Sequence, residues 1–196
     1  STDLVAQKSK PFTGIISQTI QYEGDWDPAT LAQQPKEIKI TVAETKTKTD
    51  MLVAGTSIST ITNTEEQSQI ILINAMGMKI YVKSTKEQIL ADLENEPVIR
   101  YFDETKTIAG MTAKKAEYVV KDEFGDDKTT TVYYTEEIGN EQFNFGGQFH
   151  GLKGFPLEYQ VQTEEGKITF TTTLIEPKKK IKDSDFLIPS DYEEMS

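Results

Sequence analysis

Apolar and polar residues alternate along most of the chain. Residues 37–42 read Glu-Ile-Lys-Ile-Thr-Val, and residues 78–83 and 157–162 follow the same rule. A period of two places apolar side chains on one face of a strand, which is typical of antiparallel sheets with one buried face. The pattern predicts about eleven strands, at residues 12–23, 37–43, 45–54, 57–64, 68–74, 77–83, 98–106, 114–121, 128–135, 155–163 and 167–176.

Turn-forming residues separate several of these strands at short spacing. They occur at residues 75–77, 124–127 and 164–166, and Gly110 favours a tight bend before another strand. Threonine, a β-branched residue that suits a pleated sheet, occurs 25 times among 196 residues. We therefore predict a mainly β (α+β) fold, with a single large curved antiparallel sheet or an incomplete barrel of about eleven strands.

Two short segments have helical signals instead. Asp27 followed by Pro28 is an N-cap with proline at the first helical position, and this predicts a helix that begins at Pro28 and continues over residues 29–34. A second helix is predicted to begin at Ser84, with Glu87 completing a capping box and Pro97 ending the segment. We expect these short helices to cover the concave face of the curved sheet.

The sequence predicts a single folded domain. Residues 1–11 are polar and unpatterned and predict a flexible N-terminal tether, which leaves residues 12–196 as a single β domain. Residues 45–50 alternate threonine with charged side chains, which predicts a solvated or edge strand. The glycines of residues 145–154 predict a flexible joint that does not divide the domain.

Composition excludes several classes of function. Acidic residues number 32 against 21 basic ones, the net charge is −11, and Arg100 is the one arginine, so nucleic acid is not an expected partner. The absence of cysteine rules out disulfides and thiolate metal sites. No apolar run approaches the ~18 residues that a transmembrane helix needs. We expect no enzyme activity, no catalytic residue, no metal and no cofactor.

Polar candidates for chemistry each have a structural explanation as well. His150 is the one histidine and has the chemistry of a general base, but no nucleophile lies at a catalytic spacing, so a loop histidine is the favoured interpretation. Asp25 and Asp27, and the acidic turn at residues 122–127, do not follow a calcium-loop order. The basic run of residues 178–180 fits a phosphate or lipid headgroup, although a solvated strand end is the more ordinary explanation.

Large apolar residues at the predicted helices, the turns and the glycine-rich loop are the candidates for ligand binding. A strongly bent sheet has a concave side that helices and loops either fill or leave open as an apolar pocket. Methionine suits such pockets because its side chain is flexible and polarisable. Ordinary core packing is the competing explanation for the seven candidate lining residues, Trp26, Met76, Met78, Leu90, Leu93, Phe143 and Phe145.

Short motifs in the second half of the chain follow one another in a recognisable order. They include Thr-Ile-Ala-Gly at residues 107–110, Gly-Phe-Pro-Leu at residues 154–157 and Phe-Leu-Ile-Pro-Ser-Asp-Tyr at residues 186–192. The succession resembles an exported Bacteroidetes family whose fold is similar to the lipoprotein-sorting carriers LolA and LolB. The motifs cover residues 98–195, and the strand order covers the whole chain. Tyr192 also has a plain structural interpretation, as a residue that pins the tail to the sheet.

The resemblance implies a fold and a location rather than a set of active residues. It implies an unclosed curved sheet whose helices cover acyl chains, in a protein that is exported and either periplasmic or outer-membrane-associated. A lipid anchor on a cysteine just upstream of Ser1 is compatible with this location. The family has no catalytic motif that could be carried over to this chain.

We therefore expect a non-enzymatic cell-envelope protein that binds a lipid, an acyl chain or another hydrophobic small molecule in the concavity of the sheet. Two alternatives stay open. One is a structural or protein-interaction surface protein whose interior is plugged by Leu90, Leu93 and neighbouring aromatic residues. The other is a hydrolase that works through a converging pair of carboxylates.

Overall fold

The structure is a computed structural model that describes residues 11–93 and 95–195, so the predicted tether lies outside the described residues except for Pro11. One twelve-stranded sheet contains every strand of this part of the chain. Two α-helices and two 3-10 helices accompany it. The elements are β1 (Thr13–Gly24), α1 (Pro28–Gln33), β2 (Glu37–Ala43), β3 (Lys46–Val53), β4 (Thr56–Asn63), β5 (Ser68–Ala75), β6 (Met78–Ser84), α2 (Lys86–Asp92), β7 (Val98–Ile108), β8 (Met111–Lys121), β9 (Asp127–Thr135), η1 (Glu141–Asn144), β10 (Phe155–Gln162), β11 (Gly166–Pro177), η2 (Asp183–Phe186) and β12 (Glu193–Glu194).

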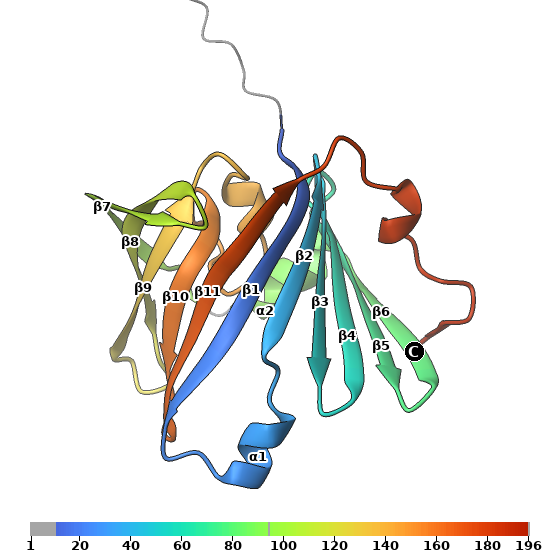
Figure 1. Cartoon of the computed structure of the whole chain (residues 1–196), viewed down its shortest axis with the longest axis horizontal. Coiled ribbons are helices and arrows are strands. Elements are labelled where there is room, and N and C mark those ends of the chain that lie inside the picture. Colours follow the sequence, from blue (N-terminus) through green and yellow to red (C-terminus); the bar gives the residue numbers. More distant parts are fainter. Residues whose placement is uncertain (1–10, 94, 196) are drawn as a thin grey trace, which may run out of the picture.

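The sheet is open and curved, and it confirms the predicted fold class (Figure 1). Its strand order is β12-β6-β5-β4-β3-β2-β1-β11-β10-β9-β8-β7, so the first and last long strands lie side by side in the middle. Two details differ from the prediction. The sheet has twelve strands rather than eleven, and β12 pairs with β6 in parallel while the other neighbouring strands are antiparallel.

Tight hairpins join the strands as the turn residues predicted. Three of the turns place a non-glycine residue and then a glycine in the left-handed region, at Ala54-Gly55, Met76-Gly77 and Ala109-Gly110. Two consecutive positive φ angles are the geometry of the two-residue turn that matches the twist of paired strands. The tight bend predicted at Gly110 is confirmed, with a φ of 81°.

Helix α2 begins one residue later than the sequence predicted. Thr85 is the N-cap, and its side chain accepts a hydrogen bond from the backbone of Gln88, whose side chain accepts one from the Thr85 backbone in return. The capping box predicted from Ser84 and Glu87 is therefore wrong. Ser84 is unavailable as a cap because it is still paired with Gln69 as the last residue of β6.

The two faces of the sheet are covered by different parts of the chain. We call the face that carries α2 and residues 136–154 the inner face, and the sheet curves around these segments (Figure 1). The C-terminal tail, residues 178–195, packs on the opposite, outer face through Phe186 and then adds β12 to the edge of the sheet beside β6. The prediction that both short helices cover the concave face is wrong for α1, which has no buried residue and lies beyond the ends of β1 and β2.

Strand β3 was predicted to be a solvated or an edge strand. It lies between β2 and β4 in the interior of the sheet, so the edge alternative is wrong, while its lysines remain partly exposed as a solvated strand requires. The physical reason is that the inner face accepts threonine there: Thr47 is buried, while Lys46 and Lys48 belong to the outer face and remain partly exposed. A strand without aliphatic residues at one end can thus occupy a central position.

The core consists of three clusters of buried side chains. The first joins β1, β2 and β10 to the covering loop through Ile16, Val42, Leu157 and Ile138. The second packs Phe149 and Leu152 of the loop on β8 and β9. The third lies on the outer face, where Phe186 of the tail packs on Ile61 and Leu72, with Tyr192 against the same cluster. The predicted role of Tyr192 in pinning the tail is confirmed.

Candidate functional site

Side chains on the inner face of β2 to β6 form rows that run across the strands. Residues that face each other in an antiparallel register point to the same side of the sheet, so the register defines each row. One row contains only aliphatic residues and methionine, and we call it the apolar row: Ile38, Met51, Ile58, Ile73 and Ile80. The two rows above it become progressively more polar, with Ile40, Thr49, Thr60, Ile71 and Val82, and then Val42, Thr47, Thr62, Gln69 and Ser84.

Every member of the apolar row is partly exposed rather than buried. The cover of the inner face contacts the sheet at the polar row, where Gln69 Nε2 donates a hydrogen bond of 3.5 Å to the backbone oxygen of Phe145. Helix α2 contributes one buried side chain, Ile89, which packs against Gly146. A Cβ at Gly146 would lie 2.4 Å from Ile89 Cγ2, so only glycine permits this close approach. The apolar row therefore retains solvent-accessible hydrocarbon on a folded inner face.

Aromatic residues form the neighbouring part of the inner face, on β1, β10 and β11. Phe170 is paired with Ile20 on one side and with Tyr159 on the other. The rings of Tyr159 and Phe170 are stacked with centroids 4.6 Å apart, and Phe149 of the covering loop meets Tyr159 edge-on at 4.7 Å. This side of the curved sheet is thus filled by aromatic packing, in contrast to the strands that carry the apolar row.

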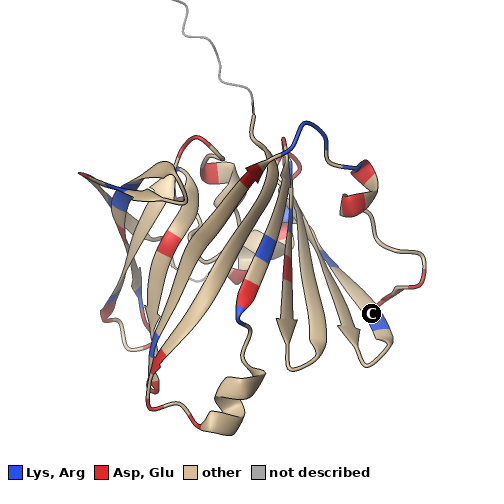
Figure 2. Ribbon diagram, in the orientation of Figure 1, with Lys and Arg blue, Asp and Glu red and all other residues tan. Residues whose placement is uncertain are grey.

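The hairpin tips next to the apolar row carry no charge. Residues 51–64 and 67–78 contain no Asp, Glu, Lys or Arg, in a chain with 27% charged residues. Leu52, Met76 and Met78 are exposed at these tips. Figure 2 shows the tip between β3 and β4 without acidic or basic residues, while the nearby connection between β1 and α1 is acidic. The apolar row therefore ends beside two hairpin tips that carry no charge.

Residues 136–154 form a cover with its own hydrogen bonds, and it contains the glycines that the sequence offered as a flexible joint. Asn144 is buried, and its Nδ2 donates hydrogen bonds of 2.8 Å to the backbone oxygens of both Leu152 and Gly154. His150 Nδ1 accepts a hydrogen bond of 2.9 Å from the Gly146 backbone, so the neutral imidazole carries its proton on Nε2. These bonds connect separate parts of the loop to one another.

Tyr118 ties this cover to β8. Its hydroxyl donates a hydrogen bond of 2.7 Å to the backbone oxygen of His150. Burial raises the pKa of Tyr118 from 10.0 to about 12, and burial also raises the pKa of Tyr159 beneath the same loop. Both phenols are therefore kept in their neutral forms by the folded protein.

These raised pKa values predict a loss of stability in alkali. The unfolded chain releases the phenolic protons near pH 10 while the folded protein retains them, so the stabilisation is complete below pH 10 and is lost as the pH rises from 10 to 12. We expect the urea midpoint to fall over this interval and to fall less in Tyr118→Phe. An identical pH dependence of the two proteins would contradict the prediction.

The seven apolar candidates from the sequence lie in four separate places. Phe143 packs against the core cluster of β1 and β2, and Phe145 is buried in the cover beside His150. Leu90 lies on α2 and is exposed, and Leu93 is the C-cap of that helix. Met76 and Met78 occupy the exposed tip between β5 and β6. Trp26 follows β1 and packs edge-on against Tyr22 with centroids 5.4 Å apart.

The apolar row itself was missing from the sequence-based candidates. Its signal was present, because each member sits at an alternating apolar position of a predicted strand. Two of those strands lie in the charge-free segments, 51–64 and 67–78. What the sequence could not show is that these alternating positions align in register across five strands.

The other candidates for chemistry stay apart in the structure. Within residues 11–93 and 95–195, no three His, Asp or Glu side chains gather as a metal site. No helix in that same part of the chain is both long enough and apolar enough to cross a bilayer. The hydrogen bond from Gly146 gives His150 a structural role in the loop.

No family model matches the sequence, and no curated protein matches it. Among solved structures, LprF from Mycobacterium bovis is similar with a TM-score of 0.34 and 10% identity, over 87% of this chain and 89% of that one. An outer membrane lipoprotein-sorting protein domain from Vibrio parahaemolyticus is similar with a TM-score of 0.36 and 10% identity, over 88% and 87% of the two chains. These likenesses are too distant to transfer a property of either protein to this chain.

Proposed function

We propose that the protein is a non-enzymatic binding protein that holds an acyl chain, or a hydrophobic molecule of similar shape, along the apolar row. The observation that carries this proposal is the partial exposure of five aligned apolar side chains on the inner face of the sheet. Aliphatic surface that stays in contact with water lowers stability, and a hydrocarbon ligand would remove it from water.

The dimensions of the row suit one acyl chain. Neighbouring strands lie about 4.8 Å apart, so five strands give a row of about 19 Å. One leaflet of a bilayer contributes about half of the ~30 Å hydrocarbon core. A single lipid chain laid across β2 to β6 would therefore contact every member of the row. Leu90 and Leu93 belong to the segment between β6 and β7 and supply further apolar surface near the inner face.

The uncharged hairpin tips support the same proposal. A hydrophobic ligand that approaches between charged side chains must remove them from water, which costs free energy. The tips that carry Leu52, Met76 and Met78 lack charges, so they offer an approach to the row without this cost. The motif resemblance supports an exported protein of the cell envelope, periplasmic or outer-membrane-associated, where lipids are available.

A fluorescent fatty acid tests the proposal. We expect saturable binding to the wild-type protein, and binding weakened by about tenfold or more in Ile73→Glu, since a carboxylate in the row loses its hydration when hydrocarbon covers it. Leu174→Glu is the matched control, because Leu174 is an exposed apolar residue on β11 whose partner Ser17 lies on the outer face. Circular dichroism checks that both variants are folded.

Two results would contradict the proposal. One is the absence of any bound fatty acid by native mass spectrometry of the wild-type protein. The other is equal affinity in Ile73→Glu, Leu174→Glu and the wild type.

A second candidate function is supported by the filled part of the inner face. Ile138, Phe143, Phe149 and Leu152 of the cover pack directly on the strands there. A protein whose inner face is completed in this way would serve as a structural or protein-interaction module, without a small ligand. The fatty-acid titration separates the two functions, because this second one predicts no saturable binding.

A further inference from the structure

A cleft lined by three lysines lies at the end of the sheet opposite the uncharged hairpin tips. It has a volume of about 360 Å³ and lies between the turn joining β2 to β3 and the start of the C-terminal tail. Lys46, Lys179 and Lys180 line it, together with the hydroxyl-bearing residues Thr13 and Thr45. Two acidic residues, Glu44 and Asp183, belong to the same lining.

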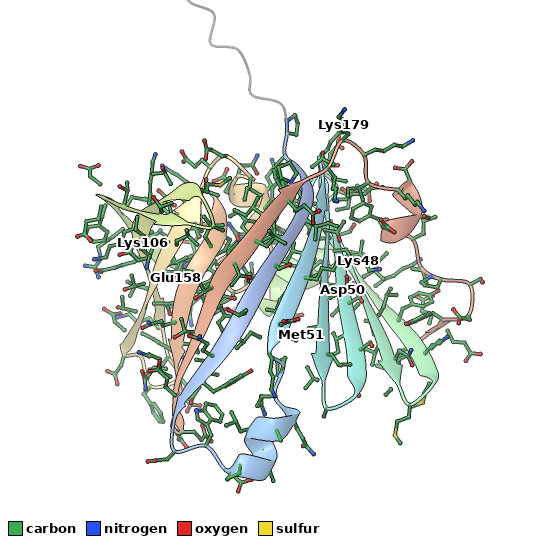
Figure 3. The ribbon with its side chains drawn as sticks, viewed as in Figure 1. Lys48, Asp50, Met51, Lys106, Glu158 and Lys179 are labelled. Atoms are coloured by element: carbon green, nitrogen blue, oxygen red, sulfur yellow. The ribbon has the colours of Figure 1, made fainter. Side chains whose placement is uncertain are left out.

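The segment that carries two of these lysines is held at both ends. The Lys178 backbone nitrogen donates a hydrogen bond of 2.8 Å to the Thr13 oxygen, which fixes the start of the tail to β1. Further on, Phe186 is buried against Ile61 and Leu72 on the outer face. Figure 3 shows Lys179 at the top of this arch, above β3 with Lys48. Lys179 and Lys180 are therefore presented by an anchored arch rather than by a loose chain end.

The charge of the cleft is opposite to that of the whole molecule. Three ammonium groups and two carboxylates line it, whereas the chain has a net charge of −11. None of the three lysines forms an ion pair with a residue of the described part of the chain, although Lys178 next to them is paired with Glu176 at 2.7 Å. Figure 2 shows this basic stretch where the chain leaves β11.

We propose that the lysine cleft binds a phosphoryl anion, supplied either by a lipid headgroup or by a soluble phosphate compound. Lysine ammonium groups bind phosphate oxygens as point charges, and a tetrahedral anion can accept from several directions at once. Lys46 from β3 and Lys179 and Lys180 from the arch approach such an anion from two sides. The site is separate from the apolar row, which lies on the inner face, so it stands without the proposed acyl binding.

The test uses the full chain labelled with ¹⁵N and two probes at low ionic strength. The first probe is inorganic phosphate, with sodium chloride of equal ionic strength as its reference. The second is sedimentation with vesicles of phosphatidylcholine, alone or mixed with phosphatidylglycerol. The variant K179Q/K180Q removes two cleft lysines, and K36Q/K128Q removes the same charge from exposed lysines outside the cleft.

We expect saturable shifts of the backbone resonances of Thr45, Lys46 and Ile181, and binding about tenfold weaker in K179Q/K180Q but unchanged in K36Q/K128Q. Shifts with inorganic phosphate would support the site with a soluble source. Retention only on vesicles with phosphatidylglycerol would support it with a lipid source. No response to either probe would overturn the proposal, and so would an equal loss in both variants, because the response would then follow net charge alone.

Discussion

Leu157→Ala is expected to lower the free energy of unfolding by about 2–5 kcal/mol. Leu157 is 0% exposed and lies on β10 within the cluster that contains Ile16, Val42 and Ile138. Its neighbours belong to three different parts of the chain, each fixed by its own backbone pairing or loop hydrogen bonds. They cannot move together to fill the space that the smaller side chain leaves, so the cost of the cavity adds to the lost burial.

Urea-induced unfolding measures this change, and Leu174→Ala is its control. Leu174 is half exposed on β11, and its truncation is expected to change stability by no more than about 0.5 kcal/mol. If the two variants had the same stability, the assignment of Leu157 to the central core would be wrong.

Asn144→Ala has the second largest expected effect, about 2–4 kcal/mol. The side chain of Asn144 is the donor for the backbone oxygens of Leu152 and Gly154, and no water replaces it easily because the residue is buried. Both oxygens would lose their partner within the folded protein. Because the bonds connect parts of the cover, we also expect the substitution to speed up amide hydrogen exchange relative to the wild type. This increase should be larger in residues 136–154 than in β1 and β11.

The matched control for this prediction lies four residues earlier. Asn140 caps η1, and its Oδ1 accepts a hydrogen bond of 2.9 Å from the Gln142 backbone in an exposed position. Asn140→Ala removes one solvated bond and is expected to cost about 1 kcal/mol. An equal or larger loss in Asn140→Ala than in Asn144→Ala would show that burial of the amide is not what makes the cover stable.

The strands could be predicted well from the sequence because their signal is local. Alternating residues such as those of β2, and turn pairs such as Met76-Gly77, depend only on neighbours along the chain. Each of the eleven long strands lies where the pattern placed it, within a few residues at either end. The two residues of β12 are too few for any period, and their pairing with β6 depends on where the tail docks.

The arrangement of layers was harder to predict because it depends on distant contacts. The glycines near Gly146 predicted flexibility, yet the position needs glycine because Ile89 packs against it. The hydrogen bonds of Asn144 to a chain segment eight to ten residues away have no signature in composition. The irregular spacing of Phe143, Phe145, Phe149 and Leu152 was the one available sign that this loop packs on the sheet.

The candidate site likewise has one part with a local signal in the sequence and one part that depends on distant contacts. Met76 and Leu90 could be singled out from the sequence because they are large apolar residues at a turn and on a helix, and Met78 because it directly follows that turn at the start of β6; all three are exposed. The apolar row consists of ordinary strand residues, such as Ile58 and Ile73, that a sequence reader assigns to a buried core. Only the combination of register and partial exposure distinguishes them.

The two rims of the open sheet bear on how the protein avoids aggregation. On one side, Glu193 and Glu194 form the outermost strand, so an approaching strand from another molecule would meet carboxylates. On the other side, β7 breaks its regular pairing between Tyr101 and Thr105, where Asp103 and Glu104 are exposed. Charged side chains and an irregular ladder make poor templates for fibril growth. A protein that keeps hydrocarbon exposed on its inner face can therefore still resist stacking edge to edge with its own copies.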